Sequence, residues 1–217
     1  SELYDYLSQG QMPPEGSVVI TFDDGYASNY AYAFPILKKY GLKANIAVVV
    51  RSTEIEPPMP EGATYPAIGL PHLTFDQMRE MQASGLIEFG SHTYDGHGDV
   101  VINAAGDVAP ALVNKEYHPE TGTLETDWEF KLRVTNELTM SKSALERQLG
   151  VPITYFAYPY GRYSDMLQNL LIQNGYHIAV TTRSAQATAQ DKALLLPRIN
   201  VPNTMTVNEF LRVVSGN

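Results

Sequence analysis

The sequence of 217 residues contains no cysteine. Disulfide bonds and thiolate chemistry are therefore excluded, and any metal ion must be held by His, Asp or Glu side chains. No window approaches the roughly 18 consecutive apolar residues that a membrane-spanning helix needs. The first ten residues also lack the basic start and the apolar run of a signal peptide. We therefore expect no membrane span, signal or lipid anchor within this chain.

Basic residues are also scarce. Lys and Arg together number 15 against 24 Asp and Glu, which gives a formal net charge of −9. Because the chain has no Lys/Arg-rich block to neutralise a phosphate backbone, we predict that nucleic acid is not a partner. The hydrophobic content of 44% instead indicates a compact domain that buries a substantial core, and it excludes a disordered chain.

Short β-rich runs alternate with amphipathic stretches along the chain. The predicted strands are residues 17–22, 44–50, 86–91, 153–158 and 177–182. The predicted helices are a stretch that ends at residue 40, then 74–84, 126–149, 164–174 and a last helix that begins after residue 206. The proline-rich segment 51–71 and the turn-rich segment 93–125 are predicted as long loops without regular structure. This alternation favours a parallel α/β sheet, as a barrel or an open sheet, with its chemistry in the loops after the strands.

Two adjacent carboxylates, Asp23 and Asp24, directly follow the first predicted strand. A bound divalent cation would relieve their repulsion, with one Asp as a ligand and the other available as a base. A solvated turn closed by Gly25 is the alternative, because Asp-Gly is common in turns. The pair alone leaves both interpretations open.

Two of the five histidines, His92 and His97, follow the third predicted strand. Their spacing of five residues would not aim both imidazoles at one ion in a helix or a strand. A loop between them would let the two rings converge on a metal and, with Asp24, form the Asp/His/His set of an open catalytic site. Two unrelated surface histidines are the alternative.

The fourth predicted strand ends at Tyr158, and Pro159, Tyr160 and Gly161 follow it directly. Gly161 permits a tight turn that would aim a backbone N–H, such as that of Tyr160, at a developing oxyanion. Aromatic residues near the loop ends, Tyr94 among them, can stack on sugar rings, although we expect most of the 14 tyrosines to pack within the protein.

Three motifs in this order resemble those of the polysaccharide deacetylases of carbohydrate esterase family 4, the NodB homology domain: TFDDG at 21–25, SHTYDGH at 91–97 and YPYG at 158–161. The wider sequence is similar to the branch that contains the PgaB and IcaB poly-β-1,6-N-acetylglucosamine N-deacetylases. The resemblance covers residues 17–201. It implies an α/β fold, a distorted (β/α) barrel of the NodB type, and hydrolysis of N-acetyl groups from an N-acetylglucosamine polymer.

The resemblance also implies roles for individual residues. Asp24, His92 and His97 would hold a divalent metal ion, for which Zn, Co, Ni and Fe are all candidates. Asp23 would act as the general base, and the backbone N–H of Tyr160 would stabilise the oxyanion. Asp23 and Tyr160 are therefore the expected catalytic residues.

Substrate contacts and location follow from the same resemblance. Tyr94, Pro159 and Tyr160 are the expected substrate-binding residues. The expected partner is an N-acetylglucosamine polysaccharide, and this substrate class implies an extracellular or cell-surface location.

The sequence departs from the family pattern at two points. Many members carry an arginine that pairs with the base where this chain has Ala157, so Arg162 or Arg198 would have to replace it. The late Leu-x-His motif that supplies the general acid has no match, and in the PgaB and IcaB branch that histidine precedes the first motif. We therefore expect residues 1–16 to be the end of an N-terminal segment, 17–217 to form the deacetylase domain, and the barrel to be incomplete at its N-terminus.

Other functions stay open at this point. The same fold and metal would serve a peptidoglycan or chitin-oligosaccharide deacetylase, and the two long loops would decide between these polymers. Without its general acid, the chain would instead be a non-catalytic glycan-binding module. A non-haem iron oxygenase uses a similar ligand set, but such sites usually lie on all-β folds rather than on the α/β pattern seen here.

Overall fold

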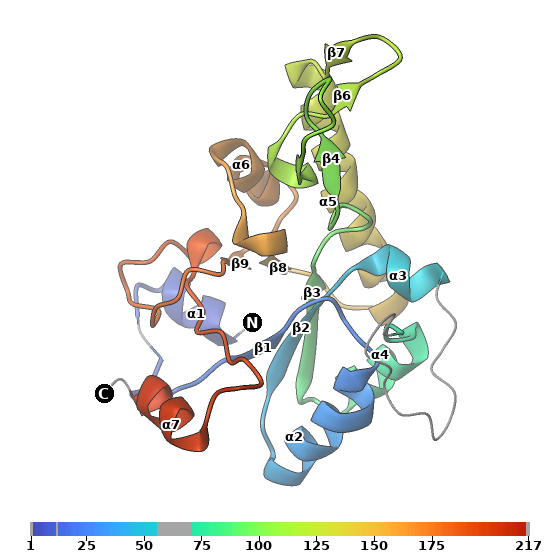
Figure 1. Cartoon of the computed structure of the whole chain (residues 1–217). Coiled ribbons are helices and arrows are strands. Elements are labelled where there is room, and N and C mark those ends of the chain that lie inside the picture. Colours follow the sequence, from blue (N-terminus) through green and yellow to red (C-terminus); the bar gives the residue numbers. More distant parts are fainter. Residues whose placement is uncertain (1, 12, 56–70, 216–217) are drawn as a thin grey trace.

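The computed structural model describes residues 2–11, 13–55 and 71–215 of the chain (Figure 1). Its centre is a five-stranded sheet in the order β1-β2-β3-β8-β9, and every pairing in it is parallel. The strands are Ile20–Phe22 (β1), Ala44–Val48 (β2), Ile87–Ser91 (β3), Tyr155–Ala157 (β8) and Ile178–Val180 (β9). All five predicted strands are confirmed, although each is shorter than predicted. Because the strands are parallel, their carboxyl ends meet at one edge of the sheet.

The predicted helices are confirmed, and side-chain caps explain where α4 and α5 begin. The helices are Phe34–Tyr40 (α2), Phe75–Ala83 (α4), Asp127–Leu149 (α5), Asp165–Gln173 (α6) and Val207–Ser215 (α7). Thr74 and Thr126 each cap a helix through a complete capping box. Gly41 ends α2 in the left-handed conformation that glycine adopts at little cost. A short π-helix, Asn29–Ala33 (η1), precedes α2.

The two faces of the sheet are covered differently. Alternate residues of β2 point to opposite sides, so Ile46 and Val48 join the large cluster that packs against α2, α4, α5 and α6. Ala47 joins a smaller cluster on the other face. An additional helix, Glu2–Ser8 (α1), packs Leu3, Tyr4 and Leu7 against that cluster. Figure 1 shows α1 on the opposite side of the sheet from α2 and α4.

The sheet is curled, and the evidence for this is a side chain that reaches from one edge of the sheet to the other. In a flat sheet, β1 and β9 would lie about 19 Å apart across four strand spacings. Leu196 forms a parallel bridge with Val180 of β9, and Arg198, two residues further on, donates hydrogen bonds to Thr21 and Asp23 at β1. An arginine side chain cannot span 19 Å, so the edges must approach one another. The sheet is thus a half-barrel, which matches the predicted distorted (β/α) barrel.

Both predicted long loops require correction. Segment 93–125 contains two antiparallel hairpins and a 3₁₀ turn: Asp99–Val101 (β4) with Val108–Pro110 (β5), Ala111–Val113 (η2), and Tyr117–His118 (β6) with Thr123–Leu124 (β7). Segment 51–71 begins in a helix, Val50–Ile55 (α3), where irregular structure was predicted. Residues 56–70 lie outside the described residues. Two further short 3₁₀ turns are Pro159–Gly161 (η3) and Ala193–Leu195 (η4).

Within the part of the chain that the structure describes, no helix has the length and apolar character needed to cross a membrane.

Candidate metal centre

The ends of the parallel strands bring the predicted metal-ligating residues together. Asp24 follows β1, and His92 follows β3 directly. The Nε2 atoms of His92 and His97 lie 3.5 Å and 3.3 Å from Oδ1 of Asp24. One ligand atom from each of the three residues lies within 4.8 Å of the other two. The loop that was needed to let both histidines converge is therefore present.

His92 is oriented by the strand beside it. Its ring is buried, and Nδ1 lies 2.7 Å from the carbonyl oxygen of Ala157, so Nδ1 donates and Nε2 is left as an acceptor facing Asp24. Burial lowers the pKa of the His92 imidazole, although the negative charge of Asp23 opposes this shift. The neutral ring is the form that ligates a metal, and a histidine whose second nitrogen donates to a carbonyl is typical of metal sites.

A divalent cation fits this donor set. Two imidazole nitrogens and one carboxylate oxygen converge, and the side chains of Asp24 and His97 remain partly exposed, at 27% and 32%. Three protein ligands with access to solvent are the pattern of a catalytic zinc site, and the same set also accepts Co, Ni or Fe.

Asp23 is held by an arginine from the far end of the chain. Arg198 Nη1 and Nη2 donate to the two carboxylate oxygens of Asp23 at 2.8 Å and 2.7 Å. Burial alone would raise the pKa of Asp23, but the hydrogen bonds from Arg198 and the nearby His92 outweigh it and lower that pKa below its ordinary value of 3.8. Of the two arginines predicted to replace the one missing at Ala157, Arg198 therefore pairs with Asp23, whereas Arg162 is exposed.

Tyr160 lies beside the ligand group in a strained turn. Its φ of 56° is left-handed, and its half-exposed ring lies 4.8 Å from the ring of His97. A Cβ on Gly161 would come within 2.1 Å of the Thr182 hydroxyl oxygen, so only glycine fits after Tyr160. Pro159 is buried in the same turn.

Tyr94 lies in the loop between the two histidines. Its ring is partly buried against the large core cluster, and its hydroxyl donates to Glu54 of α3 at 2.8 Å. Its role in substrate binding stays a prediction.

Sequence reasoning did not identify Glu137 of α5, which binds the same loop. One oxygen of its carboxylate accepts hydrogen bonds from the backbone N–H groups of Tyr94, Asp95 and Gly96. No motif marks this residue, because it lies 40 positions after His97 in a helix with many charged side chains.

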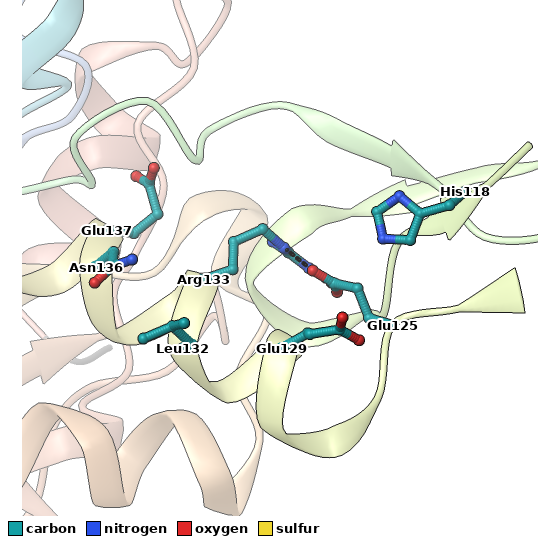
Figure 2. Close-up of a pocket in the computed structure, with 7 residues that line it drawn as sticks. All are labelled: His118, Glu125, Glu129, Leu132, Arg133, Asn136 and Glu137. Carbon is teal, nitrogen blue, oxygen red and sulfur yellow. Dashed lines mark hydrogen bonds and ion pairs between the residues drawn. The ribbon is translucent and has the colours of Figure 1, made fainter. Parts of the chain in front are cut away.

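A groove lies along α5 next to this loop (Figure 2). It has a volume of about 390 Å³ and is lined by seven residues: His118, Glu125, Glu129, Leu132, Arg133, Asn136 and Glu137. Figure 2 shows Arg133 facing Glu125, with which it forms an ion pair at 2.7 Å. The three predicted metal ligands are not among the lining residues, so this groove is distinct from the metal centre.

The sequence and the fold match known proteins. The family model for polysaccharide deacetylase matches residues 10–179. The poly-β-1,6-N-acetyl-D-glucosamine N-deacetylase of Escherichia coli K12 is 29% identical over 94% of this chain, and the chain spans 30% of that protein's length. The deacetylase domain of BpsB from Bordetella bronchiseptica matches with a TM-score of 0.81 at 30% identity, over 91% of this chain and 76% of that one. A de-N-acetylase from Aggregatibacter actinomycetemcomitans matches with a TM-score of 0.83 at 30% identity, over 98% and 80% of the two chains.

Proposed function

The chain belongs to the polysaccharide deacetylase family, and from this premise we propose that it removes N-acetyl groups from poly-β-1,6-N-acetylglucosamine in a metal-dependent reaction. The observation that carries the proposal is the convergence of Asp24, His92 and His97 next to the Asp23–Arg198 pair. The name of the E. coli relative supports the choice of polymer. We further propose that the protein meets this polymer outside the cell or at its surface, and that residues 17–217 form the catalytic domain.

The proposed chemistry divides two tasks between the neighbouring carboxylates. Asp24, His92 and His97 would hold a divalent cation, which supplies a charge that polarises the acetamide carbonyl and lowers the pKa of water. Asp23 would accept the proton of the attacking water, and it would pass this proton to the amine as the C–N bond breaks, which leaves acetate and the free amino sugar. Arg198 keeps Asp23 in the ionised form and fixes the orientation of both of its oxygens.

Tyr160 would contribute twice at the mouth of the site. Its backbone N–H would donate to the acetamide oxygen as that oxygen gains negative charge. Its half-exposed ring, adjacent to His97, would pack against a sugar ring of the polymer. Pro159 and Tyr94 would support this contact from the turn and the loop on either side.

Acetate release from β-1,6-linked N-acetylglucosamine oligomers tests the proposal. Metal-stripped protein should be inactive, and reloading with Zn, Co or Ni should restore activity. Chitin oligosaccharides and peptidoglycan serve as the competing substrates. Glycan binding without acetate release by fully loaded protein would contradict catalysis and favour a binding module.

Substitution of the carboxylates tests their separate roles. Asp23→Asn is expected to abolish turnover while metal content is retained, because the base is lost and the ligands remain. Asp24→Ala is expected to lose both turnover and bound metal. Equal metal loss in the two variants, measured by elemental analysis after gel filtration, would refute the division of tasks.

A further inference from the structure

The backbone of the loop that carries His97 binds one carboxylate oxygen of α5. Oε2 of Glu137 accepts from the backbone N–H groups of Tyr94, Asp95 and Gly96 at 3.1, 2.8 and 2.8 Å. Three successive N–H groups that converge in this way form a concave anion-binding site in the backbone. Here the anion is a side chain of the protein itself, so the carboxylate determines the shape of the loop.

The close approach depends on the loop sequence. A Cβ on Gly96 would lie 3.0 Å from Oε2 of Glu137 and 3.0 Å from Cδ2 of Leu112, which is tighter than ordinary contact. Gly98, on the other side of His97, has no atom within 4 Å of the corresponding position. The tight fit around a glycine is therefore specific to the side of the loop that faces Glu137.

One turn further along α5, a second contact holds the start of the same loop. The hydroxyl oxygens of Ser141 and Ser91 lie 2.6 Å apart, and Ser91 also accepts the backbone N–H of Thr93 at 3.1 Å. Both side chains are fully buried. Helix α5 thus binds the segment on both sides of the turn at Thr93.

The two histidines depend on this loop to different degrees. His92 directly follows β3 and is fixed by its hydrogen bond to Ala157, so its position is set by the sheet. His97 lies five residues beyond the strand, and the contacts to Glu137 are made by the three residues that precede it. Backbone N–H groups of Val50, Arg51 and Ala111 also donate to this loop, and α5 adds the contacts nearest to His97 on its N-terminal side.

We propose that Glu137 is a positioning residue of the metal centre, which places the Nε2 atom of His97 for binding a cation together with Asp24 and His92. This inference rests on the metal dependence proposed above. Figure 2 shows Glu137 and Arg133 leaving α5 on the same side, one turn apart. Arg133 donates to the carbonyl oxygens of Ala111 and Asn114, so the same helix face also binds the segment 93–125 between its two hairpins.

Titration of the metal-free full chain with Zn²⁺, monitored by calorimetry, tests the inference without measuring activity. Glu137→Ala is expected to raise the Kd for Zn²⁺ by about 10- to 100-fold, the range typical when a group that orients a metal ligand is lost. Glu137→Gln keeps a carbonyl oxygen at the same place and should recover most of the affinity. The visible spectrum of the Co²⁺-loaded protein should change in Glu137→Ala, because the geometry around the ion depends on His97.

Glu146→Ala is the matched control. Glu146 lies on the same helix, and its carboxylate also accepts a backbone N–H, that of Ile153 at 3.0 Å, but near the C-terminal end of α5, away from the loop that carries His97. This variant should lose stability without a change in Kd. Equal weakening of Zn²⁺ binding in both variants would mean that any loosening of α5 suffices, and it would overturn the specific role of Glu137.

A second pair of variants tests the loop from its other side, and it decides the question if Glu137→Ala does not fold. Gly96→Ala should weaken Zn²⁺ binding several-fold, whereas Gly98→Ala should not. If Glu137→Ala folds and binds Zn²⁺ with wild-type affinity, the inference is overturned while the proposed function stands. If Glu137→Ala does not fold, wild-type Zn²⁺ affinity in Gly96→Ala has the same meaning. A wild-type chain that binds no Zn²⁺, Co²⁺ or Ni²⁺ would overturn the proposed metal dependence itself, and the inference with it.

Discussion

Replacing Arg198 with methionine should destabilise the fold as well as disturb the base. Arg198 donates to both carboxylate oxygens of Asp23, to the hydroxyl of Thr21 at 3.2 Å and to the carbonyl oxygen of Thr181 at 3.0 Å. It therefore links the segment beside β9 to β1 across the open side of the curled sheet. Methionine fills a similar volume but can donate none of these hydrogen bonds.

The expected cost follows from the burial of the pair. The side chains of Arg198 and Asp23 are 17% and 27% exposed. Removing one member of a buried ion pair costs about 3–5 kcal/mol, and because about a quarter of Asp23 reaches solvent we take the lower end, about 3 kcal/mol. At about 2–4 °C per kcal/mol for a domain of this size, the melting temperature should fall by about 6–12 °C.

Chemical denaturation of the metal-free protein measures this cost, because a bound cation would partly replace the positive charge of Arg198. The control is Arg162→Met, since Arg162 is exposed and should change stability by no more than about 0.5 kcal/mol. A double-mutant cycle with Asp23→Asn should give a coupling of about 2 kcal/mol between the two positions. A loss below about 1 kcal/mol in Arg198→Met, or a loss equal to that of the control, would refute the reasoning.

Two further predictions concern Glu125 and Gly161. Glu125 is 5% exposed; burial would raise its pKa, but hydrogen bonds from Arg133 and the Glu116 backbone lower it below 4.5. Because the pKa is lower in the folded state, the ionised carboxylate stabilises the fold above about pH 4.5, and this contribution is lost as the pH falls through the folded pKa. The difference in free energy of unfolding between wild type and Glu125→Gln, measured by urea denaturation, should therefore become smaller below about pH 4.5. Gly161→Ala should lower the free energy of unfolding more than Gly150→Ala does. Both positions have positive φ, for which a loss of about 1–2 kcal/mol is expected, but only the new Cβ at 161 would collide with other atoms. Equal melting temperatures of these two variants would contradict that comparison.

Local signals in the sequence were sufficient for most of the fold. The capping boxes at Thr74 and Thr126 satisfy orphan backbone N–H groups within four residues, so the helix starts could be predicted without knowledge of the tertiary structure. Strands β4 to β7 have only two or three residues each, and such short pairings show no period of two over a useful length. The tertiary contacts between and beside these hairpins, such as those of Arg133 with Ala111, Asn114 and Glu125, are not revealed by the sequence.

The candidate site was predictable where its residues follow strands directly. Asp23, Asp24 and His92 are placed by the parallel sheet alone, since strand ends converge at one edge. Other contacts of the site come from distant parts of the chain: Arg198, which pairs with Asp23, follows it by 175 residues, and Glu137 accepts hydrogen bonds from the loop before His97, 41 to 43 residues earlier. Nothing in the local sequence distinguishes Glu137 from other charged side chains. Arg198 was one of two candidate partners of Asp23, and only the fold shows that it, and not Arg162, reaches the carboxylate.

The backbone of the site gives independent support for its function. In the described part of the chain, the non-glycine residues with positive φ are Asp24, Thr93 and Tyr160, at 69°, 98° and 56°. A left-handed conformation costs about 1–2 kcal/mol for a residue with a Cβ. Neighbouring segments hold two of them in place, since the N–H groups of Val49 and Val50 donate to the carbonyl oxygens of Asp24 and Thr93. Strain that the fold retains at such positions is typical of functional sites. Glycine at any of the three would relieve it, so the side chains of Asp24 and its neighbours in the site are better explained by the chemistry they serve than by the stability of the fold.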